Sequence, residues 1–338
     1  LAEFERSYER LGIRFDDMRG ESFYEDKMPA VLHELEAKGL LSTSRDATVV
    51  DLTDGEQDLG MALVRKADGS TLYLTRDLAS AQFRQDEYGF SRSLYVVGGS
   101  QSLHFQQMIE VLRRLGRPWA DRIEHVPFGM MRFADRKMAT RKGDIIPLEQ
   151  VLDRAVELAR ERIEDGATSK GRALPDDVAA VAERIGLGAV VFNDIKNRRA
   201  RDVVFDWDEV LSFEGETGPY LQYTAARIAS MEARFEEPLT AAVDFDLLAG
   251  GGELQLCLAL ADLPVALRRA VAASEPSLVA DQLLDIAAKF SSLYARKDWK
   301  VLSDDVDTTR ARLLLAHAVR VALRNGLGWL GIAVPERM

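Results

Sequence analysis

A basic segment near the middle of the chain, RKMATRKGD at residues 136–144, has a composition suited to phosphate chemistry. It places four cations within seven residues and follows them with Gly143. Lys137, Arg141 and Lys142, on a loop that ends at a flexible backbone point, could close over a phosphate chain. There they would neutralise the charge that builds up in phosphoryl or adenylyl transfer. The alternative is a solvated surface loop.

The segment YLTRDLA at residues 73–79 combines a phenol with a carboxylate. Tyr73 and Asp77 are four residues apart, so they share one face if the segment is helical. A carboxylate beside a hydroxyl suits a planar cation such as a guanidinium, because charge-assisted bidentate hydrogen bonds are strong and directional. The alternative is that Arg76 and Asp77 form a surface ion pair, which contributes less than about 1 kcal/mol.

A third candidate site follows an apolar run in LYVVGGSQSLHF, residues 94–105. Gly98 and Gly99 end a predicted strand, and a helix begins near Gln101. Ligands of open α/β sheets bind at the carboxyl ends of strands, where helix amides face them. Gln101 and His104 are about one helical turn apart and are expected to face such a crevice. The alternative is a simple Gly-Gly turn beside a hydrogen-bonded core histidine.

The elements that must position these residues alternate in type over the first third of the chain. Helical spacing of apolar residues occurs in RDLASAQFRQDEYG (76–89) and QSLHFQQMIEVLRRLG (101–116), and both segments stop at glycine. Asp68-Gly69 is a hairpin signal within the second of the predicted strands. Segments rich in Val, Tyr, Leu and Met are predicted strands: 47–52, 61–75, 93–99 and 123–131. The alternation predicts a parallel α/β sheet.

The remainder of the chain is predicted to be helical, which indicates a helical bundle after the α/β part. The chain has 338 residues, of which 47% are hydrophobic, and this favours two domains. The single cysteine, Cys257, fits a reducing cytoplasm, and no run is long enough to span a membrane. The amphipathic segments lie at about 175–200, 218–236, 253–273, 277–296 and 308–330.

The net charge of −11 argues against a protein that binds nucleic acid by charge alone. Both halves of the chain carry more Asp and Glu than Lys and Arg. A polyanionic partner would therefore have to be recognised by local patches.

Taken in order, these motifs resemble arginyl-tRNA synthetase, a class I aminoacyl-tRNA synthetase. The resemblance covers nearly the whole chain, from GESFYEDKMPAVLHELEAKGLL to the terminal LRNGLGWLGIAVPERM. It implies an α/β then all-α chain, namely the second half of a Rossmann-like catalytic domain followed by a helical anticodon-binding domain. The segments that carry it are YLTRDLASA, LYVVGGSQSLHFQQM, EHVPFGMM, KMATRKGDIIPLEQVL and VVFNDIKNRRARDVVFDWDEVLSFEGETGPYLQYTAARI.

The resemblance gives the basic segment the role of the lysine-rich signature that grips the ATP phosphates. Two positions depart from the usual Lys-Met-Ser-Lys pattern, because Ala139 stands for serine and Thr140 for the second lysine. Arg141 or Lys142 then takes the role of that lysine. The implied arginine-binding residues are Tyr73, Asp77 and Gln101, and the catalytic cations are Lys137, Arg141 and Lys142. The ATP-binding candidates are His104, Met138, Thr140 and Gly143.

The helical half resembles an anticodon-binding domain, which would hold unpaired bases by stacking and edge contacts rather than by overall charge. Any of the aromatic candidates could instead belong to the bundle core. Arg198 and Arg199 of KNRRAR are expected to touch the phosphate backbone, with a solvated helix face as the alternative. The base-contacting candidates are Tyr220, Tyr223, Tyr294, Trp299 and Met338.

The chain is therefore expected to be the carboxyl-terminal part of an arginine–tRNA ligase. The His-Ile-Gly-His-type motif and the family's amino-terminal domain are expected before Leu1, so the chain alone should be inactive. Its expected partners are tRNA, L-arginine and ATP with Mg²⁺, and it is expected to be a cytoplasmic monomer without a membrane or protein-bound metal. The expected domains are 1–212, with connecting helices from about 147, and 213–338. A non-catalytic paralogue and an unrelated nucleotidyltransferase are the alternatives.

Overall fold

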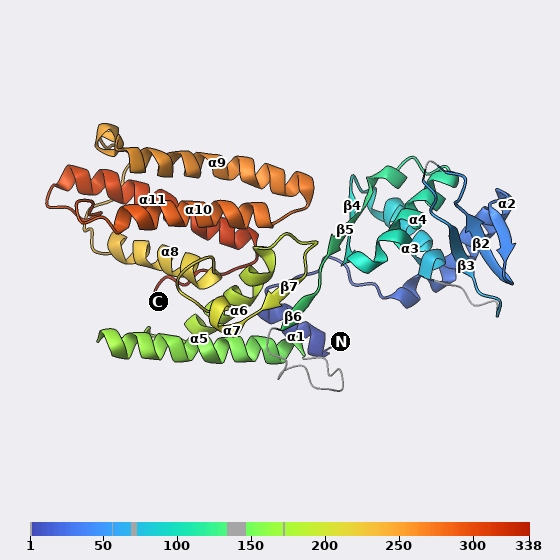
Figure 1. Ribbon diagram of the computed structural model, residues 1–338, viewed down its shortest axis with the longest axis horizontal. Coiled ribbons are helices and arrows are strands. Elements are labelled where there is room, and N and C mark those ends of the chain that lie inside the picture. Colours follow the sequence, from blue (N-terminus) through green and yellow to red (C-terminus); the bar gives the residue numbers. More distant parts are fainter. Residues whose placement is uncertain (1, 56, 69–72, 134–146, 172) are drawn as a thin grey trace. The chain divides into compact units, whose positions relative to one another are not determined.

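The computed structural model describes residues 2–55, 57–68, 73–133, 147–171 and 173–338. These residues form two compact units, each described here by itself (Figure 1). The α/β unit is Phe15–Met130, and the helical unit combines Leu1–Arg14 with Met131–Met338. The chain therefore passes between the units twice. Within the described residues, no helix has the length and apolarity that crossing a membrane requires.

One part of the α/β unit is an antiparallel sheet, whereas the sequence predicted a parallel sheet. Its strands are β1 (Leu41–Ser44), β2 (Ala47–Asp51) and β3 (Met61–Arg65). Arg45 and Asp46 link β1 to β2 with positive φ angles of 48° and 63°, as a tight hairpin of the type I′ kind requires. The predicted strand 61–75 was too long, because β3 ends at Arg65.

A parallel strand pair forms the second part of the α/β unit, as the sequence predicted. Strands β4 (Ser93–Gly98) and β5 (Ile123–Phe128) are in register from Ser93 opposite Ile123 to Gly98 opposite Phe128. Two helices share their hydrophobic core, α3 (Tyr73–Tyr88) and α4 (Ser102–Arg114). Leu78 on α3 and Met108 on α4 are fully buried there, and Tyr95 and Val97 of β4 pack against them.

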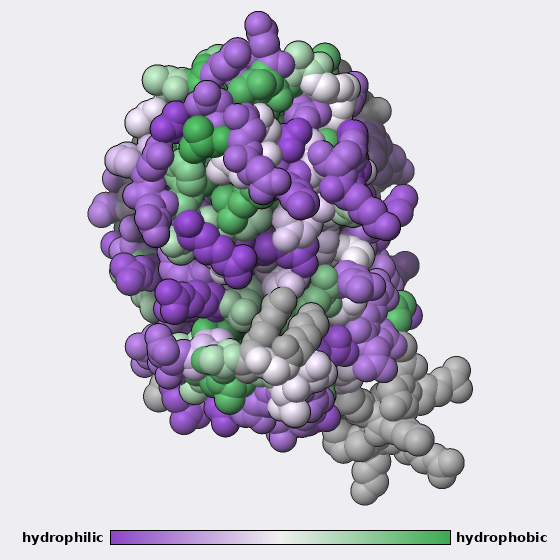
Figure 2. Space-filling view, turned by 90° about the vertical axis from the view of Figure 1, so that its left-hand side faces the viewer, coloured by the Kyte–Doolittle hydropathy of each residue, from purple (hydrophilic) through white to green (hydrophobic). Residues whose placement is uncertain are grey.

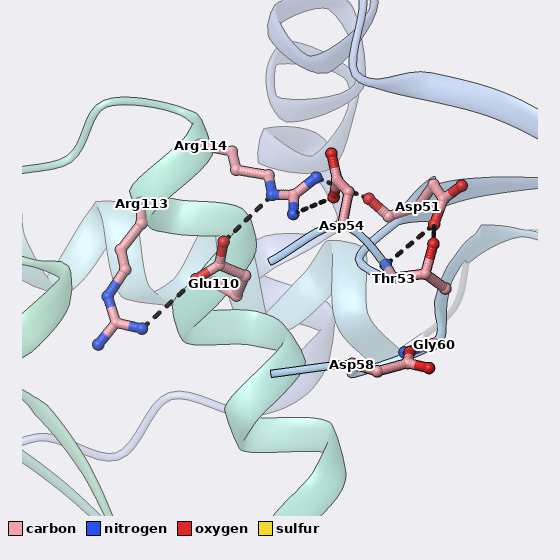
Figure 3. A network of polar contacts seen from close by, with 8 residues as sticks. All are labelled: Asp51, Thr53, Asp54, Asp58, Gly60, Glu110, Arg113 and Arg114. Carbon is pink, nitrogen blue, oxygen red and sulfur yellow. Dashed lines mark hydrogen bonds and ion pairs between the residues drawn. The ribbon is translucent and has the colours of Figure 1, made fainter. Parts of the chain in front are cut away.

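A polar network holds α4 against the loop between β2 and β3 (Figure 3). The Arg114 guanidinium donates to the Asp51 carbonyl at 2.7 Å, to Asp54 at 2.7 Å and to Glu110 at 3.2 Å. Gln107, about two helical turns nearer the start of α4, donates to the Leu59 carbonyl at 2.8 Å. Because these contacts span both ends of the loop, they fix the rotation of α4 about its axis.

The remaining elements of the α/β unit are η1 (Glu21–Lys27), α2 (Met28–Ala37), η2 (Gly99–Gln101) and η3 (Ala120–Arg122). In the helical unit, four helices lie side by side: α8 (Gly218–Glu232), α9 (Gly251–Ala273), α10 (Ser277–Tyr294) and α11 (Val306–Trp329) (Figure 1). They share one core and match the predicted bundle segments. Hydrophilic side chains cover most of the face shown in Figure 2, with hydrophobic ones in separate groups.

A second core of the helical unit lies between α5 (Leu148–Lys170) and α6 (Val178–Ile195). Helix α1 (Ala2–Arg10) is tied to these helices by Arg10, which donates to Asp153 at 2.7 Å and Glu183 at 2.9 Å. The sequence did not predict the strands β6 and β7, because three residues are too few for a pattern. The shorter elements are β6 (Met131–Phe133), β7 (Val203–Phe205), α7 (Trp207–Val210) and η4 (Phe245–Leu248).

Helices α5 and α6 approach closely at Gly186, and this contact yields a test of the packing. A Cβ atom on Gly186 would lie 2.7 Å from the Val156 nitrogen and 2.8 Å from the Ala155 carbonyl carbon. Backbone atoms cannot move aside without separating the helices, so Gly186→Ala should lower the free energy of unfolding by about 1–3 kcal/mol. Urea-induced unfolding measures this change.

Gly166 on α5 provides the matched control. An added Cβ atom there meets nothing within 4 Å, so Gly166→Ala should raise the free energy of unfolding by about 0.5–1 kcal/mol. Equal effects of the two substitutions would contradict the close approach of α5 and α6.

Candidate functional site

The start of α3 is fixed by a buried hydrogen bond. The Thr75 hydroxyl donates to the Val64 carbonyl of β3 at 2.9 Å, and Leu74 is buried beside it. With these two residues turned inward, Tyr73 is 68% exposed. Tyr73 and Asp77 lie on the same helix, one turn apart, so the structure confirms the spacing argument made from the sequence.

Asp77 and His104 form the centre of the candidate site. The His104 Nε2 atom on α4 lies 2.7 Å from the Asp77 Oδ2 atom on α3. The His104 side chain is 23% exposed and that of Asp77 is 33% exposed, so both groups are accessible to a ligand. Gln101, at the end of η2, is exposed immediately before α4. The structure therefore brings Asp77 and His104 together, and it places Tyr73 at the first residue of α3 and Gln101 immediately before α4.

Arg76 does not neutralise Asp77. Its guanidinium forms an ion pair with Glu21, whereas the ion pair described for Asp77 is the one with His104. The alternative of an Arg76–Asp77 surface pair is therefore wrong. Within the part of the chain that the structure describes, no Arg or Lys forms an ion pair with the Asp77 carboxylate.

The floor of the site consists of stacked rings. The Phe105 ring stacks on His125 with centroids 4.6 Å apart, and it contacts Tyr95 at 5.0 Å. The His125 Nε2 atom lies 3.0 Å from the Val97 carbonyl oxygen. Burial raises the pKa of the Tyr95 phenol, which keeps this group neutral beneath Asp77.

The basic segment falls outside the described residues. This applies to all the predicted phosphate-binding residues in it: Lys137, Met138, Thr140, Arg141, Lys142 and Gly143. Among the residues that are described, no cluster of three or more His, Cys, Asp or Glu side chains is arranged to hold a metal ion.

A second candidate site is a cavity of about 430 Å³ in the helical unit. Residues from α5, from α8 and from the end of the chain line it, and they include three of the predicted base-contacting residues. These are Tyr220, Tyr223 and Met338. The hydroxyl of Tyr220 lies 2.8 Å from that of Ser291 on α10, which fixes the ring at the cavity wall. Residues far apart in the sequence therefore form one aromatic pocket.

Arg227 adds a cation to this aromatic pocket. Its guanidinium carbon lies 4.5 Å from the centre of the Tyr223 ring and 5.0 Å from that of Tyr294. Arg162 of α5 also lines the cavity. Neither arginine was predicted from the sequence. The i, i+4 spacing of Tyr223 and Arg227 was a usable signal, whereas the position of Arg162 depends on how α5 packs near α8.

One predicted tRNA contact requires correction. Trp299 is only 3% exposed and donates from Nε1 to the buried Glu253 carboxylate at 2.6 Å, so its ring cannot stack on a base. Arg199 donates from Nε to the Ser274 carbonyl at 2.9 Å, at the end of α9, and its contact with phosphate stays a prediction. Arg198 is exposed, and its contact with phosphate stays a prediction.

The burial of Trp299 gives a prediction that separates folding from nucleic-acid binding. Trp299→Phe leaves the Glu253 carboxylate, itself 5% exposed, without the indole donor. The free energy of unfolding should fall by about 1–3 kcal/mol, and Glu253→Leu in the same protein should restore part of it. The affinity of the folded fraction for tRNA should not change, whereas Tyr223→Ala should weaken it. Weaker tRNA binding by a stable Trp299→Phe variant would contradict this.

Two consecutive regions of the chain match established families. Residues 1–207 match the family described as tRNA synthetases class I (R), catalytic domain, and residues 221–338 match the DALR anticodon binding domain. The arginine–tRNA ligase of Latilactobacillus sakei is 44% identical over 339 residues, and that of Halothermothrix orenii is 42% identical over 338 residues. Each match covers 100% of this chain and 58% of the relative.

Solved structures have the same fold. The arginyl-tRNA synthetase of Thermus thermophilus matches with a TM-score of 0.86 and 24% identity, over 99% of this chain and 62% of that one. The enzyme of Plasmodium falciparum matches with a TM-score of 0.81 and 23% identity, over 100% of this chain and 56% of that one. Because the synthetase family alone matches more than half of the residues, the chain belongs to the arginyl-tRNA synthetase family of class I.

Proposed function

We propose that this chain is the part of an arginine–tRNA ligase that binds arginine, the ATP phosphates and the anticodon loop. The reaction joins arginine to ATP as arginyl-adenylate, and the 3′ hydroxyl of the tRNA then takes the arginine. The chain spans 58% of the length of its relatives in Latilactobacillus and Halothermothrix, so the complete reaction belongs to a longer protein. The observation that carries the proposal is an accessible Asp77 carboxylate with which no Arg or Lys of the described residues forms an ion pair.

Arginine would be recognised by its guanidinium. Asp77 offers a carboxylate that accepts two parallel N–H donors, and Tyr73 offers a hydroxyl one helical turn away. Gln101, at the start of α4, is placed to contact another part of the same amino acid. The resemblance to the family supports the same three residues.

The basic segment 136–144 would bind the phosphates. Lys137 with Arg141 or Lys142 would stabilise the charge on the α-phosphate, and Mg²⁺ would enter with ATP and leave with pyrophosphate. Met138, Thr140 and Gly143 would lie against ATP. For His104, the contact with Asp77 supports a place on the amino-acid side of the site rather than on the ATP side.

The aromatic pocket of the helical unit would receive an anticodon base. Stacking on Tyr220 or Tyr223 needs no positively charged surface, which fits a chain with a net charge of −11. Arg227 and Arg162 would supply the local positive charge. We propose residues 213–338 as the anticodon-binding domain and 1–212 as the catalytic part, with a monomer as the active form.

The first test concerns the carboxylate and uses the extended enzyme, meaning this chain with the amino-terminal region that the family resemblance places before it. Asp77→Asn should lower kcat/KM for arginine by about 30- to 5,000-fold, because a desolvated guanidinium then has no counter-charge. Tyr73→Phe should lower kcat/KM for arginine by only about 2- to 13-fold, since it removes one neutral hydrogen bond. ATP–pyrophosphate exchange measures both changes.

Citrulline provides the control, because it has the shape of arginine without the charge. The unaltered enzyme should not use citrulline, and Asp77→Asn should reduce the difference in kcat/KM between arginine and citrulline. Near-normal arginine kinetics in the Asp77→Asn variant would exclude this carboxylate from substrate binding.

The second test concerns the basic segment. In the extended enzyme, Lys137→Ala combined with Lys142→Ala should lower kcat more than it raises KM for arginine, because the cations act chiefly on the transition state. Initial rates of exchange at varied arginine and ATP separate the two constants. A rise in KM at constant kcat would instead assign the segment to ground-state binding.

A further inference from the structure

We infer that His104 is a positioning residue that orients the Asp77 carboxylate and thereby sets the discrimination between arginine and uncharged analogues. The inference rests on the proposed function and goes beyond it, because it gives His104 a role toward the amino acid. The observation behind it is the contact of 2.7 Å between His104 Nε2 and Asp77 Oδ2.

The direction of this hydrogen bond follows from the chemistry of its partners. An ionised carboxylate only accepts hydrogen bonds, so the His104 Nε2 atom must carry a proton and donate it. The Nε2–H group that does this is present in both the neutral Nε2–H tautomer and the imidazolium. A carboxylate has about four lone-pair positions, and His104 occupies one of them. The others remain open to the N–H groups of a guanidinium.

His104 is held more firmly than its partner. Its ring lies edge-on to Phe105, with centroids 5.3 Å apart, and Phe105 is 5% exposed within the ring stack on His125. The contacts of Arg114 and Gln107 with the β2–β3 loop fix the rotation of the helix that carries it. The imidazole is therefore a fixed donor at the end of a rigid element.

The Asp77 carboxylate has few other constraints. Arg76 is paired with Glu21, and the Ser80 hydroxyl donates to the backbone carbonyl of Asp77 rather than to its side chain. Without His104, the carboxylate could rotate about its side-chain bonds at the surface of α3. A guanidinium needs both carboxylate oxygens in its own plane, so such rotation would weaken binding in the geometry that leads to reaction.

The test compares substitutions at His104 in the extended enzyme. His104→Ala should lower kcat/KM for arginine by about 10- to 100-fold and leave that for citrulline within about threefold. His104→Gln should keep most of the discrimination, because the glutamine amide can place an N–H donor near the position of Nε2. Substitution of a residue with a merely structural role would not change the ratio of kcat/KM for arginine to that for citrulline.

The coupling between the two residues is measured by a double-mutant cycle. In the Asp77→Asn background, His104→Ala should lower kcat/KM for arginine by less than about a further twofold, because there is no longer a charged carboxylate to orient. His317→Gln is the matched control, since it removes a histidine–carboxylate contact, with Glu232 at 3.0 Å in the helical unit, that does not involve Asp77. The ratio of kcat/KM for arginine to that for citrulline should be unchanged in this variant.

The outcomes separate the inference from the proposed function. If Asp77→Asn lowers arginine use but His104→Ala leaves the substrate ratio unchanged, the inference fails and the proposed function stands. If His104→Ala raises only KM for ATP, His104 belongs to the nucleotide site and the inference is overturned. Normal arginine kinetics in the Asp77→Asn variant would contradict both the inference and the proposed function. In the 338-residue chain, ¹⁵N NMR should find the Nε2–H tautomer of His104, and an Nδ1–H tautomer would also overturn the inference.

Discussion

The packing of α3 and α4 on the parallel strand pair is the constraint on which the amino-acid site depends. Both helices bury apolar side chains in one core, and this fixes their separation where the polar ends meet. The bond from Thr75 to Val64 fixes where α3 begins, and the Arg114 network fixes the rotation of α4. Neither contact touches the site. Together they place a carboxylate and an imidazole from different helices within hydrogen-bonding distance.

The helices and the order of the motifs were predictable from the sequence, because apolar spacing and glycine stops are local signals. The residue at which α3 begins could not be predicted in this way. Tyr73 and its neighbours have β-branched and aromatic side chains that favour a strand, and the buried Thr75 hydroxyl overrides this preference through a contact with β3. The antiparallel pairing of β1, β2 and β3 was missed for a similar reason, since strand direction depends on pairing rather than on composition.

The residues of the two sites differ in how far the sequence could predict them. Tyr73 and Asp77 share a helix, so their spacing was sufficient, whereas the partner of Asp77 lies 27 residues away. Trp299 shows the limit of reasoning from residue type. A tryptophan suits base stacking and a bundle core equally well, and the decisive contact, with Glu253, is 46 residues distant. Arg199 is similar, because only the structure reveals its bond to Ser274.

The charges around Asp77 explain why a histidine suits the position beside it. A fixed guanidinium there would cancel the charge of the carboxylate and compete with that of the substrate. Arg76, the adjacent residue, could have done so, but its ion pair with Glu21 directs it elsewhere. An exposed pair of this kind contributes little to stability. Its effect is instead to keep the Arg76 guanidinium off the Asp77 carboxylate, so that the remaining lone pairs of this carboxylate stay open to the guanidinium of a substrate.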